Sequence, residues 1–288
     1  MNALILSKNR ACQLHLLLET IKLNCPTLFN KIYIIYTGTD TEYLKGYSLL
    51  QDRHIYDNIV WQQEKDFYGD FVNFLKTNDT ELFCGLTDDC VFYRPTDLSF
   101  RVLDNIFSNS DVFCFSLRLG LNTTLQDYVS NSFQNPLTWY DIRSISYQQQ
   151  LVNIIIWSWR EICCVHNYGY PISLDGHIYR TKDMYDLTTK YSIGCLRGWE
   201  GVLAENCRRD TNKYLMSAET ESSVYCIPNN CVQDPPMHAG IKHNYTSDGL
   251  NNQYLRNNII STDSIITTGV NWCHQELEFK YVEYESDE

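Results

Sequence analysis

The first 118 residues alternate short apolar runs with segments of helical periodicity. Strands are predicted for "ALILS", "KIYIIYTG", "NIVWQQ", "ELFCGL" and "DVFCFSLRLG", and helices for the intervening "QLHLLLETIKL", "DFVNFLKTN" and "DLSFRVLDNIF". Such alternation predicts an α/β fold with a mostly parallel central sheet, in the manner of a Rossmann fold, and helices on both faces. In these sheets ligands bind beyond the carboxyl ends of the strands. Functional residues are therefore expected where the apolar runs end.

The remainder of the chain is less regular. "QQQLVNIIIWSW" places Leu151, Ile155 and Trp159 at helical spacing and predicts a helix, whereas the polar and aromatic "NTTLQDYVSNSFQNPLTWYDIRSIS" predicts a loop. "YGYPISLDGHIYRTKDM" predicts a turn, a strand and a helix start, and "GLNNQYL" a brief helix in a loop-rich C-terminal segment. We expect a domain at 1–220, with halves at 1–118 and 119–220. An extension at 221–288 is expected to pack on it and to end in a disordered acidic tail.

Charge and cysteine usage exclude some classes of partner. The net charge is −12 and no Lys/Arg cluster is present, which argues against a nucleic-acid partner. No apolar run is long enough for a membrane span, and "MNALILSKNR" lacks the features of a signal peptide. The 12 cysteines lie mostly in apolar segments without paired C-x-x-C ligand sets. These features predict a cytoplasmic protein with reduced thiols, in the host cytoplasm if the protein is viral.

Two adjacent acids, Asp88 and Asp89, directly follow the apolar run "ELFCGL". One interpretation is a strand-end turn in which one aspartate caps the next element. The other is a metal site, because Mg²⁺ and Mn²⁺ take carboxylate and phosphate oxygens together. The position at a strand's carboxyl end favours the metal site. A metal there would act as a Lewis acid on a departing diphosphate.

Two further segments carry charged side chains at comparable positions. "SKNR" is either a solvated turn or a helix start that offers N–H groups and two cations to an anionic ligand. "SLDGHIYRT" brings Asp175, His177 and Arg180 into one short segment, although its Asp-Gly pair is also an ordinary turn signal. Arg180 could instead pair with Asp183.

Glu200 and two late histidines complete the candidates. In "RGWEGVL" the apolar neighbours of Glu200 would raise its pKa towards the range of a general base. A glutamate favoured by the dipole of a helix start explains the same pattern equally well. His238 and His243 in "MHAGIKHN" are either surface residues or ligands of a metal such as Mn²⁺.

With these segments assembled, the chain resembles the GT-A nucleotide-sugar glycosyltransferases. "ALILSKNRACQLHLLLETI", "IYIIYTG" and "FCGLTDDCVFYRP" are similar to the opening half of family-2-like enzymes. A narrower group from bacteria and large DNA viruses is similar in "FSLRLGLNTT", "YGYPISLDGHIYRTKDM", "WEGVL" and "CIPNNCVQ…GLNNQYL". The resemblance runs from about Asn2 to Ile265.

The resemblance implies inverting, metal-assisted transfer of a hexosyl, deoxyhexosyl or pentosyl group. The donor would be a UDP-sugar, the acceptor a hydroxyl of a glycan or glycoprotein, and the cofactor Mn²⁺ or Mg²⁺. It implies nucleotide contacts from Ser7, Lys8, Asn9, Arg10, Tyr36, Thr37 and Asp88. It implies substrate contacts from Arg118, His177 and Trp199. Metal ligands would be Asp89, Asp88 and His243, and the catalytic residues Glu200 and, as second candidate, Asp175.

The chain departs from the family pattern at two positions. The Asp-x-Asp spacing is absent because Cys90 follows Asp89, and Gly201 stands where an Asp often follows the catalytic acid. The irregular motif leaves open a non-catalytic nucleotide- or glycan-binding protein that has kept the fold. A nucleotidyltransferase ranks last, because no Gly-rich triphosphate loop is present.

Overall fold

The structure is a computed structural model of the chain. It describes residues 1–96, 98–127, 132–133, 137, 140–147, 150–163, 166–191, 193–232 and 240–285. Within these residues nine strands form one sheet in the order β3-β2-β1-β4-β11-β6-β12-β10-β9. The sheet extends through both predicted halves of the 1–220 region, and its first four strands come from the alternating N-terminal segment.

The N-terminal part of the sheet is wholly parallel. Its strands are β1 (Asn2–Lys8), β2 (Ile32–Thr37), β3 (Ile59–Gln63) and β4 (Leu82–Thr87). The helices that connect them are α1 (Ala11–Asn24), α2 (Thr41–Asp52) and α3 (Phe67–Thr77). Aspartates cap two of these helices, since Asp40 and Asp66 accept hydrogen bonds from first-turn N–H groups of α2 and α3.

The second part of the sheet mixes directions. Its strands are β6 (Val112–Ser116), β9 (Asp141–Tyr147), β10 (Gln150–Ser158), β11 (His177–Arg180) and β12 (Leu215–Glu219). Only β10 and β11 run against the other strands of the sheet as described. The helices of this part are α4 (Phe100–Phe107), α5 (Thr181–Thr188) and α6 (Leu196–Asp210), with 3₁₀ turns at Trp159–Glu161 and Asn167–Gly169. Helix α7 (Ser247–Leu255) and the 3₁₀ turn at Thr262–Ser264 lie against α1 instead. Two-stranded ladders join β5 (Cys90–Phe92) to β13 (Val224–Cys226), β14 (Asn258–Ile260) to β15 (Tyr281–Glu283), and β7 (Leu125–Asp127) to β8 (Ser132–Phe133).

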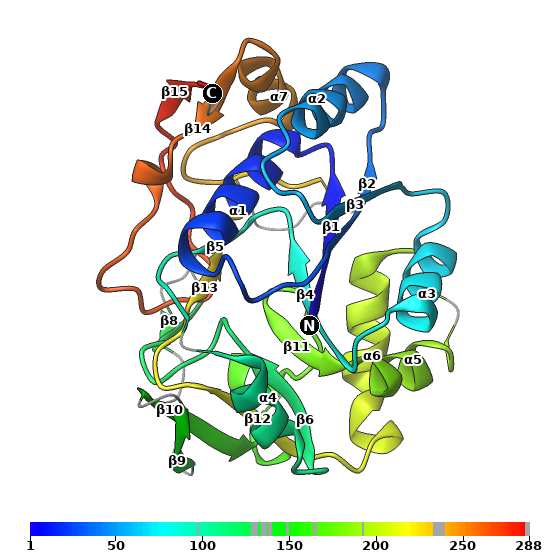
Figure 1. Cartoon of the computed structure of the whole chain (residues 1–288), viewed down its shortest axis with the longest axis vertical. Helices are drawn as coiled ribbons and strands as arrows, with labels where there is room; N and C mark the ends of the chain where they lie inside the picture. The colour runs from blue at the N-terminus through cyan, green and yellow to red at the C-terminus, as the bar shows by residue number, and fades with distance from the viewer. Residues whose placement is uncertain are drawn as a thin grey trace.

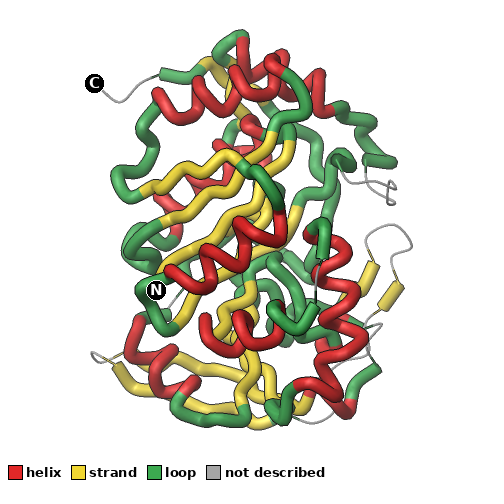
Figure 2. Tube along the Cα trace, turned by 90° about the vertical axis from the view of Figure 1, so that its right-hand side faces the viewer, coloured by secondary structure: helices red, strands yellow, loops and turns green. Residues whose placement is uncertain are grey.

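Alternation along the strands produces two core layers, one on each face of the sheet. Ala3 and Ile5 of β1 belong to one hydrophobic cluster, whereas Leu4 and Leu6 belong to the other. The first cluster receives apolar residues of α1, α2, α4 and α7, and the second those of α3, α5 and α6. Figure 1 shows α3, α5 and α6 together at one side of the molecule, and Figure 2 shows the strands running through its middle. The predicted α/β class, with helices on both faces of the sheet, is confirmed.

Two predicted elements are wrong, and helix α2 was not predicted. The segment expected to be a helix through Leu151, Ile155 and Trp159 is strand β10, which pairs with β9 and β12. Its β-branched residues favour a strand, and burial follows the strand period at its start, where Leu151 is 62% exposed and Val152 only 3%. The preceding segment, expected to be a loop, contains the short strands β7 and β8 and most of β9. The pattern of a short apolar run does not distinguish a strand from a helix, so pairing with β9 and β12 determined that this segment is a strand.

The C-terminal segment lies against the N-terminal helices. The guanidinium carbon of Arg53 lies 4.3 Å from the ring centre of Tyr254 and 4.1 Å from that of Tyr284. His15 of α1 and the Tyr254 hydroxyl are 2.9 Å apart. The boundary expected at 220/221 stays a prediction, and the tail end at 286–288 lies outside the described residues. Among the helices described, none is long and apolar enough to cross a membrane.

Candidate functional site

The sheet has a topological switch point between β1 and β4. From β1 the chain passes through α1 to β2 on one side, and it returns through α3 to β4 on the other side. Crevices at such points, beyond the carboxyl ends of the strands, are the usual ligand sites of α/β sheets. The residues after β1 and β4 meet there, which places Ser7–Arg10 beside Asp88 and Asp89.

Asp88 holds the ends of β1 and β4 together. Its carboxylate accepts hydrogen bonds from the Ser7 hydroxyl at 2.9 Å, the Lys8 backbone N–H at 3.1 Å and Arg10 Nη1 at 3.0 Å. Burial raises the pKa of Asp88 to about 6, and the charge of Arg10 opposes that rise. Asp88 is therefore ionised at neutral pH and is engaged by donors of the protein itself.

Arg10 links the acidic pair to the C-terminal segment. Its Nη1 lies 3.0 Å from Asp89 Oδ2, and its Nη2 donates to the carbonyl of Asn230. The side-chain oxygen of Asn230 accepts a hydrogen bond from Gln13 at 2.9 Å. Asn9 makes the tight turn before Arg10 possible with a left-handed φ of 57°, which asparagine tolerates. Arg10 itself is buried, so its positive charge interacts with groups of the protein itself.

A further acid, Asp175, reaches the same place from the turn before β11. The Thr87 hydroxyl lies 2.8 Å from Asp89 Oδ1 and 2.8 Å from Asp175 Oδ1. Arg118 Nη1 donates to Asp175 Oδ2 at 3.0 Å. Burial alone would raise the pKa of Asp175, but the proximity of His274, 3.7 Å away, and the charge of Arg118 hold it well below its usual range. Asp175 is therefore a carboxylate at neutral pH.

Two buried thiols complete a group of possible metal ligands. Cys90 of β5 lies opposite Cys226 of β13, with their sulfurs 3.4 Å apart. The ligand atoms of Asp89, Cys90, Asp175 and Cys226 all lie within 4.8 Å of one another. Within the described part of the chain, this is the one such group of three or more side chains. Its carboxylates suit Mn²⁺ or Mg²⁺, but neither of the other expected ligands, Asp88 and His243, belongs to it.

Glu200 lies next to this group, on the first half of α6. Its Oε1 accepts a hydrogen bond from the backbone N–H of Leu174 at 3.1 Å, so it adjoins the turn that carries Asp175. Burial, assisted by the charge of Asp175, raises the pKa of Glu200 to about 8. A carboxyl group with this pKa exchanges a proton readily near neutral pH.

The remaining residues expected at the nucleotide pocket lie around the same strand ends. The Asn9 N–H donates to the Thr37 carbonyl at 3.0 Å, and the Asn9 side chain bonds Thr39. The Tyr36 ring packs on Tyr47, with ring centres 4.7 Å apart. Lys8 is exposed. The structure thus brings the "SKNR" turn and the end of β2 together.

The three residues expected to contact the substrate are buried. Trp199 is fully buried, packs edge-on against Phe71 and donates to Thr188 at 3.0 Å, so no part of its ring can stack on a sugar. His177 is also fully buried, with Nδ1 3.1 Å from the Tyr179 hydroxyl. Arg118 is 3% exposed and acts through Asp175 rather than on a ligand directly.

The structure also bears on the alternatives stated above for the two late histidines and for Arg180. His243 is half-buried and lies against Tyr245, with ring centres 6.1 Å apart, and His238 lies outside the described residues. Arg180 is 3.5 Å from Asp183, the pairing that was the alternative to a functional role, and it also donates to the Val112 carbonyl at 2.6 Å.

Sequence reasoning missed three contributors to the site: Cys226, Asn230 and His274. Cys226 and Asn230 belong to "CIPNN", a segment that resembled the family without any feature marking it as a ligand. His274 lies 3.7 Å from Asp175 and 3.3 Å from Arg118, although it is about 100 residues further along the chain. No spacing rule could have connected these positions, because pairing between distant strands brings them together, as the β5–β13 ladder does for Cys90 and Cys226.

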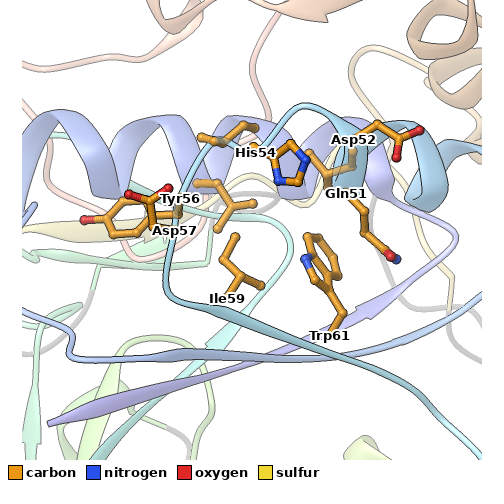
Figure 3. Close-up of a pocket in the computed structure, with 10 residues that line it drawn as sticks. Gln51, Asp52, His54, Tyr56, Asp57, Ile59 and Trp61 are labelled. Atoms are coloured by element: carbon orange, nitrogen blue, oxygen red, sulfur yellow. The ribbon is translucent and has the colours of Figure 1, made fainter.

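The cavity drawn in Figure 3 lies elsewhere. It measures about 430 Å³ and lies beside the connection from α2 into the amino end of β3. Figure 3 shows His54 and Tyr56 of that connection near Ile59 and Trp61 of β3. None of the acids described above lines this cavity. It is separate from the candidate site, which lies at the opposite ends of the parallel strands.

Comparisons with known proteins find similarity among solved structures. No family model matches the sequence, and no curated protein matches it significantly. Among solved structures, S. aureus TarS 1–349 superposes with a TM-score of 0.46 at 11% identity, covering 78% of this chain and 60% of that one. The galactosyltransferase LgtC, in complex with donor and acceptor sugar analogs, gives 0.30 at 12%, covering 45% and 48%. A cytidylyltransferase from Leptospira borgpetersenii gives 0.38 at 9%, covering 72% and 71%. The chain thus spans less than two thirds of TarS 1–349, and at these TM-scores the similarities do not define its chemistry.

Proposed function

We propose that the protein is an inverting glycosyltransferase that moves a sugar from a UDP-sugar to a hydroxyl of a glycan or glycoprotein. One observation carries the proposal. Two acids from distant segments, Asp89 and Asp175, meet on the hydroxyl of Thr87 at the carboxyl end of β4. Glu200 adjoins them through the Leu174 N–H. A charged donor and an acceptor hydroxyl need this combination of fixed charge and a titratable acid.

Donor binding is assigned to the turn after β1 and the end of β2. Because the net charge is −12, a diphosphate must be held by local groups. The exposed Lys8 and the amino end of α1 supply positive potential there. Tyr36 and Thr37 flank the turn. In this proposal Asp88 shapes the turn through Ser7 and the Lys8 N–H, and it does not contact the donor.

Mn²⁺ or Mg²⁺, if bound, would be held by oxygens of Asp89 and Asp175 and would supply positive charge where the diphosphate leaves. Glu200 is the proposed general base. It takes the proton of the acceptor hydroxyl, whose oxygen forms a bond to the anomeric carbon while the bond to the diphosphate oxygen breaks. The pKa of about 8 suits this role. Asp175 is the weaker candidate, because Arg118 and His274 keep its pKa low.

A panel of UDP-sugars with Mn²⁺, with and without acceptor glycans, tests the proposal by chromatographic detection of UDP. We expect release of UDP from at least one donor, and loss of most of that release in Glu200→Gln. Glu205→Gln is the matched control, because Glu205 is an exposed glutamate on the same helix. Absence of UDP release from every donor would count against a transferase.

The engagement of Asp88 by Arg10 favours one alternative, a nucleotide- or glycan-binding protein without catalysis. Thermal shift separates the two functions, because a ligand that binds only the folded state raises the melting temperature. Stabilisation by UDP that requires Mn²⁺ supports a working donor site, whereas stabilisation by glycans alone supports the binding protein. The cytoplasmic location and the narrower bacterial and viral group stay predictions from the sequence.

A further inference from the structure

The ligand atoms beside Thr87 differ in kind, since two are carboxylate oxygens and two are sulfurs. We propose that this site binds a thiophilic divalent ion of the zinc class through Cys90, Cys226, Asp89 and Asp175, in preference to Mn²⁺ or Mg²⁺. The ion's catalytic use rests on the proposed function, but its binding is a separate property that needs no substrate. Thiolate ligands select such ions, whereas oxygen-only sites select Mg²⁺ and Mn²⁺.

The two sulfurs are brought together by the backbone. Cys90 and Cys226 are direct partners in the antiparallel β5–β13 ladder, so their side chains leave the ladder on the same face. Both are buried, at 0% and 2% exposure, and their sulfurs lie 3.4 Å apart. The site therefore contains two adjacent, buried sulfur atoms that can bind the same ion.

The two carboxylates face the sulfurs from other elements. Asp89 comes from the turn after β4, and Asp175 from the turn before β11. Both place an oxygen 2.8 Å from the Thr87 hydroxyl, which carries one proton and can donate to only one of them. The other oxygen then meets a lone pair at short range. A cation within the group would relieve that contact.

Ligand spacing agrees with one small ion. With Zn–S of about 2.3 Å and Zn–O of about 2.0–2.2 Å, the ligand atoms of a tetrahedral zinc ion lie roughly 3.3–3.8 Å apart. The two sulfurs here are 3.4 Å apart and all four atoms lie within 4.8 Å of one another, so small side-chain movements would bring them onto one ion. Four ligands of this type are the usual number for zinc.

Charge balance favours at least one thiolate ligand. The carboxylates of Asp88, Asp89 and Asp175 carry three negative charges, and Arg10 and Arg118, which lie 3.0 Å from these carboxylates, supply two positive charges. A divalent ion held by oxygens alone would leave one uncompensated positive charge in a largely buried site. Ionisation of one thiol on binding makes the site neutral and releases one proton for each ion, and ionisation of both thiols leaves one negative charge.

Titration of the reduced full-length protein with Co²⁺ tests the inference, because cobalt–thiolate bonds give intense near-ultraviolet absorption that oxygen ligation lacks. We expect this band to saturate at one equivalent, with at least one proton released for each ion bound. A slight excess of Zn²⁺ should abolish it, and a large excess of Mn²⁺ should leave it intact. Cys226→Ala should lose the band. Cys25→Ala, which removes another buried thiol at the C-terminal cap of α1, should keep it.

Three results would overturn the inference: a reduced wild-type protein without the sulfur band, displacement of Co²⁺ by Mn²⁺ as readily as by Zn²⁺, or a Cys90–Cys226 disulfide in freshly purified protein. The wild-type measurement decides even if Cys226→Ala fails to fold. UDP release supported by Mn²⁺ in a protein without the band would overturn the inference and leave the proposed function standing. Sulfur-ligated Co²⁺ in a protein without UDP release would support the inference and count against the proposed function.

Discussion

The hydroxyl of Thr87 lies 2.8 Å from the carboxylate of Asp175, a residue 88 positions further along the chain. The contact exists because β11 inserts antiparallel between β4 and β6, which delivers the turn before β11 to the carboxyl end of β4. Gly176 turns the chain there with a φ of +85°, a conformation that glycine adopts readily. The antiparallel strand in an otherwise parallel region therefore builds the site.

Replacement of Thr87 by valine tests this contact with little change of shape. Two carboxylate oxygens would lose their shared donor, so we expect a loss of about 1–3 kcal/mol in the free energy of unfolding. We also expect UDP release to fall through kcat more than through KM, because the acids lose their relative placement. Thr87→Ser keeps the hydroxyl and should stay close to wild type. Equal effects of valine and serine would contradict the assigned role.

Arg10 forms ion pairs with both Asp88 and Asp89 in a buried position. Removal of one member of such a group leaves an uncompensated charge, so Arg10→Ala should cost about 3–5 kcal/mol in urea unfolding at neutral pH. Arg209→Ala is the control, because its exposed side chain pairs only at the surface and should change stability by less than about 0.5 kcal/mol. A similar small change for Arg10→Ala would show that the buried pairs contribute little.

Glu200 should make stability depend on pH. Its pKa rises from 4.5 to about 8 on folding, so the folded state binds more protons between these values. The stability contribution of Glu200 is full below pH 4.5 and is lost as the pH rises through 8. Glu200→Gln stays neutral, so its stability relative to wild type should increase between about pH 5 and about pH 9. A pH-independent difference in urea unfolding would mean that Glu200 titrates normally.

Variants of Trp199 distinguish a role in packing from a role in substrate binding. Because the ring is fully buried, Trp199→Ala should cost about 3–5 kcal/mol in the free energy of unfolding. Trp199→Phe keeps most of the packing and should retain KM for both donor and acceptor. A selective rise of KM for one substrate in a stable Trp199→Phe protein would restore the substrate contact expected from the sequence.

The strands of the parallel half could be predicted because each carries its own pattern of apolar residues, whereas helix α2 was not predicted. Leu82 to Leu86 gave a buried strand, and the acids after it lie at its carboxyl end. Direction and partner could not be predicted for β10 and β11, because pairing depends on residues far away in the chain. For the same reason, Cys226 and His274 could not be recognised from the sequence as site residues. Burial of Trp199 and His177 was equally hidden, since a motif gives residue types but not which face they occupy.

The most direct test of the central claim is a crystal structure of the protein with UDP and a divalent ion. We expect the uracil and ribose beside Tyr36 and Thr37, and the diphosphate at an ion held by Asp89 and Asp175. Glu200 should face the space in front of the diphosphate. A nucleotide bound away from Asp89 and Asp175, for example in the cavity between His54 and Trp61, would contradict the assignment of this site as the centre of sugar transfer.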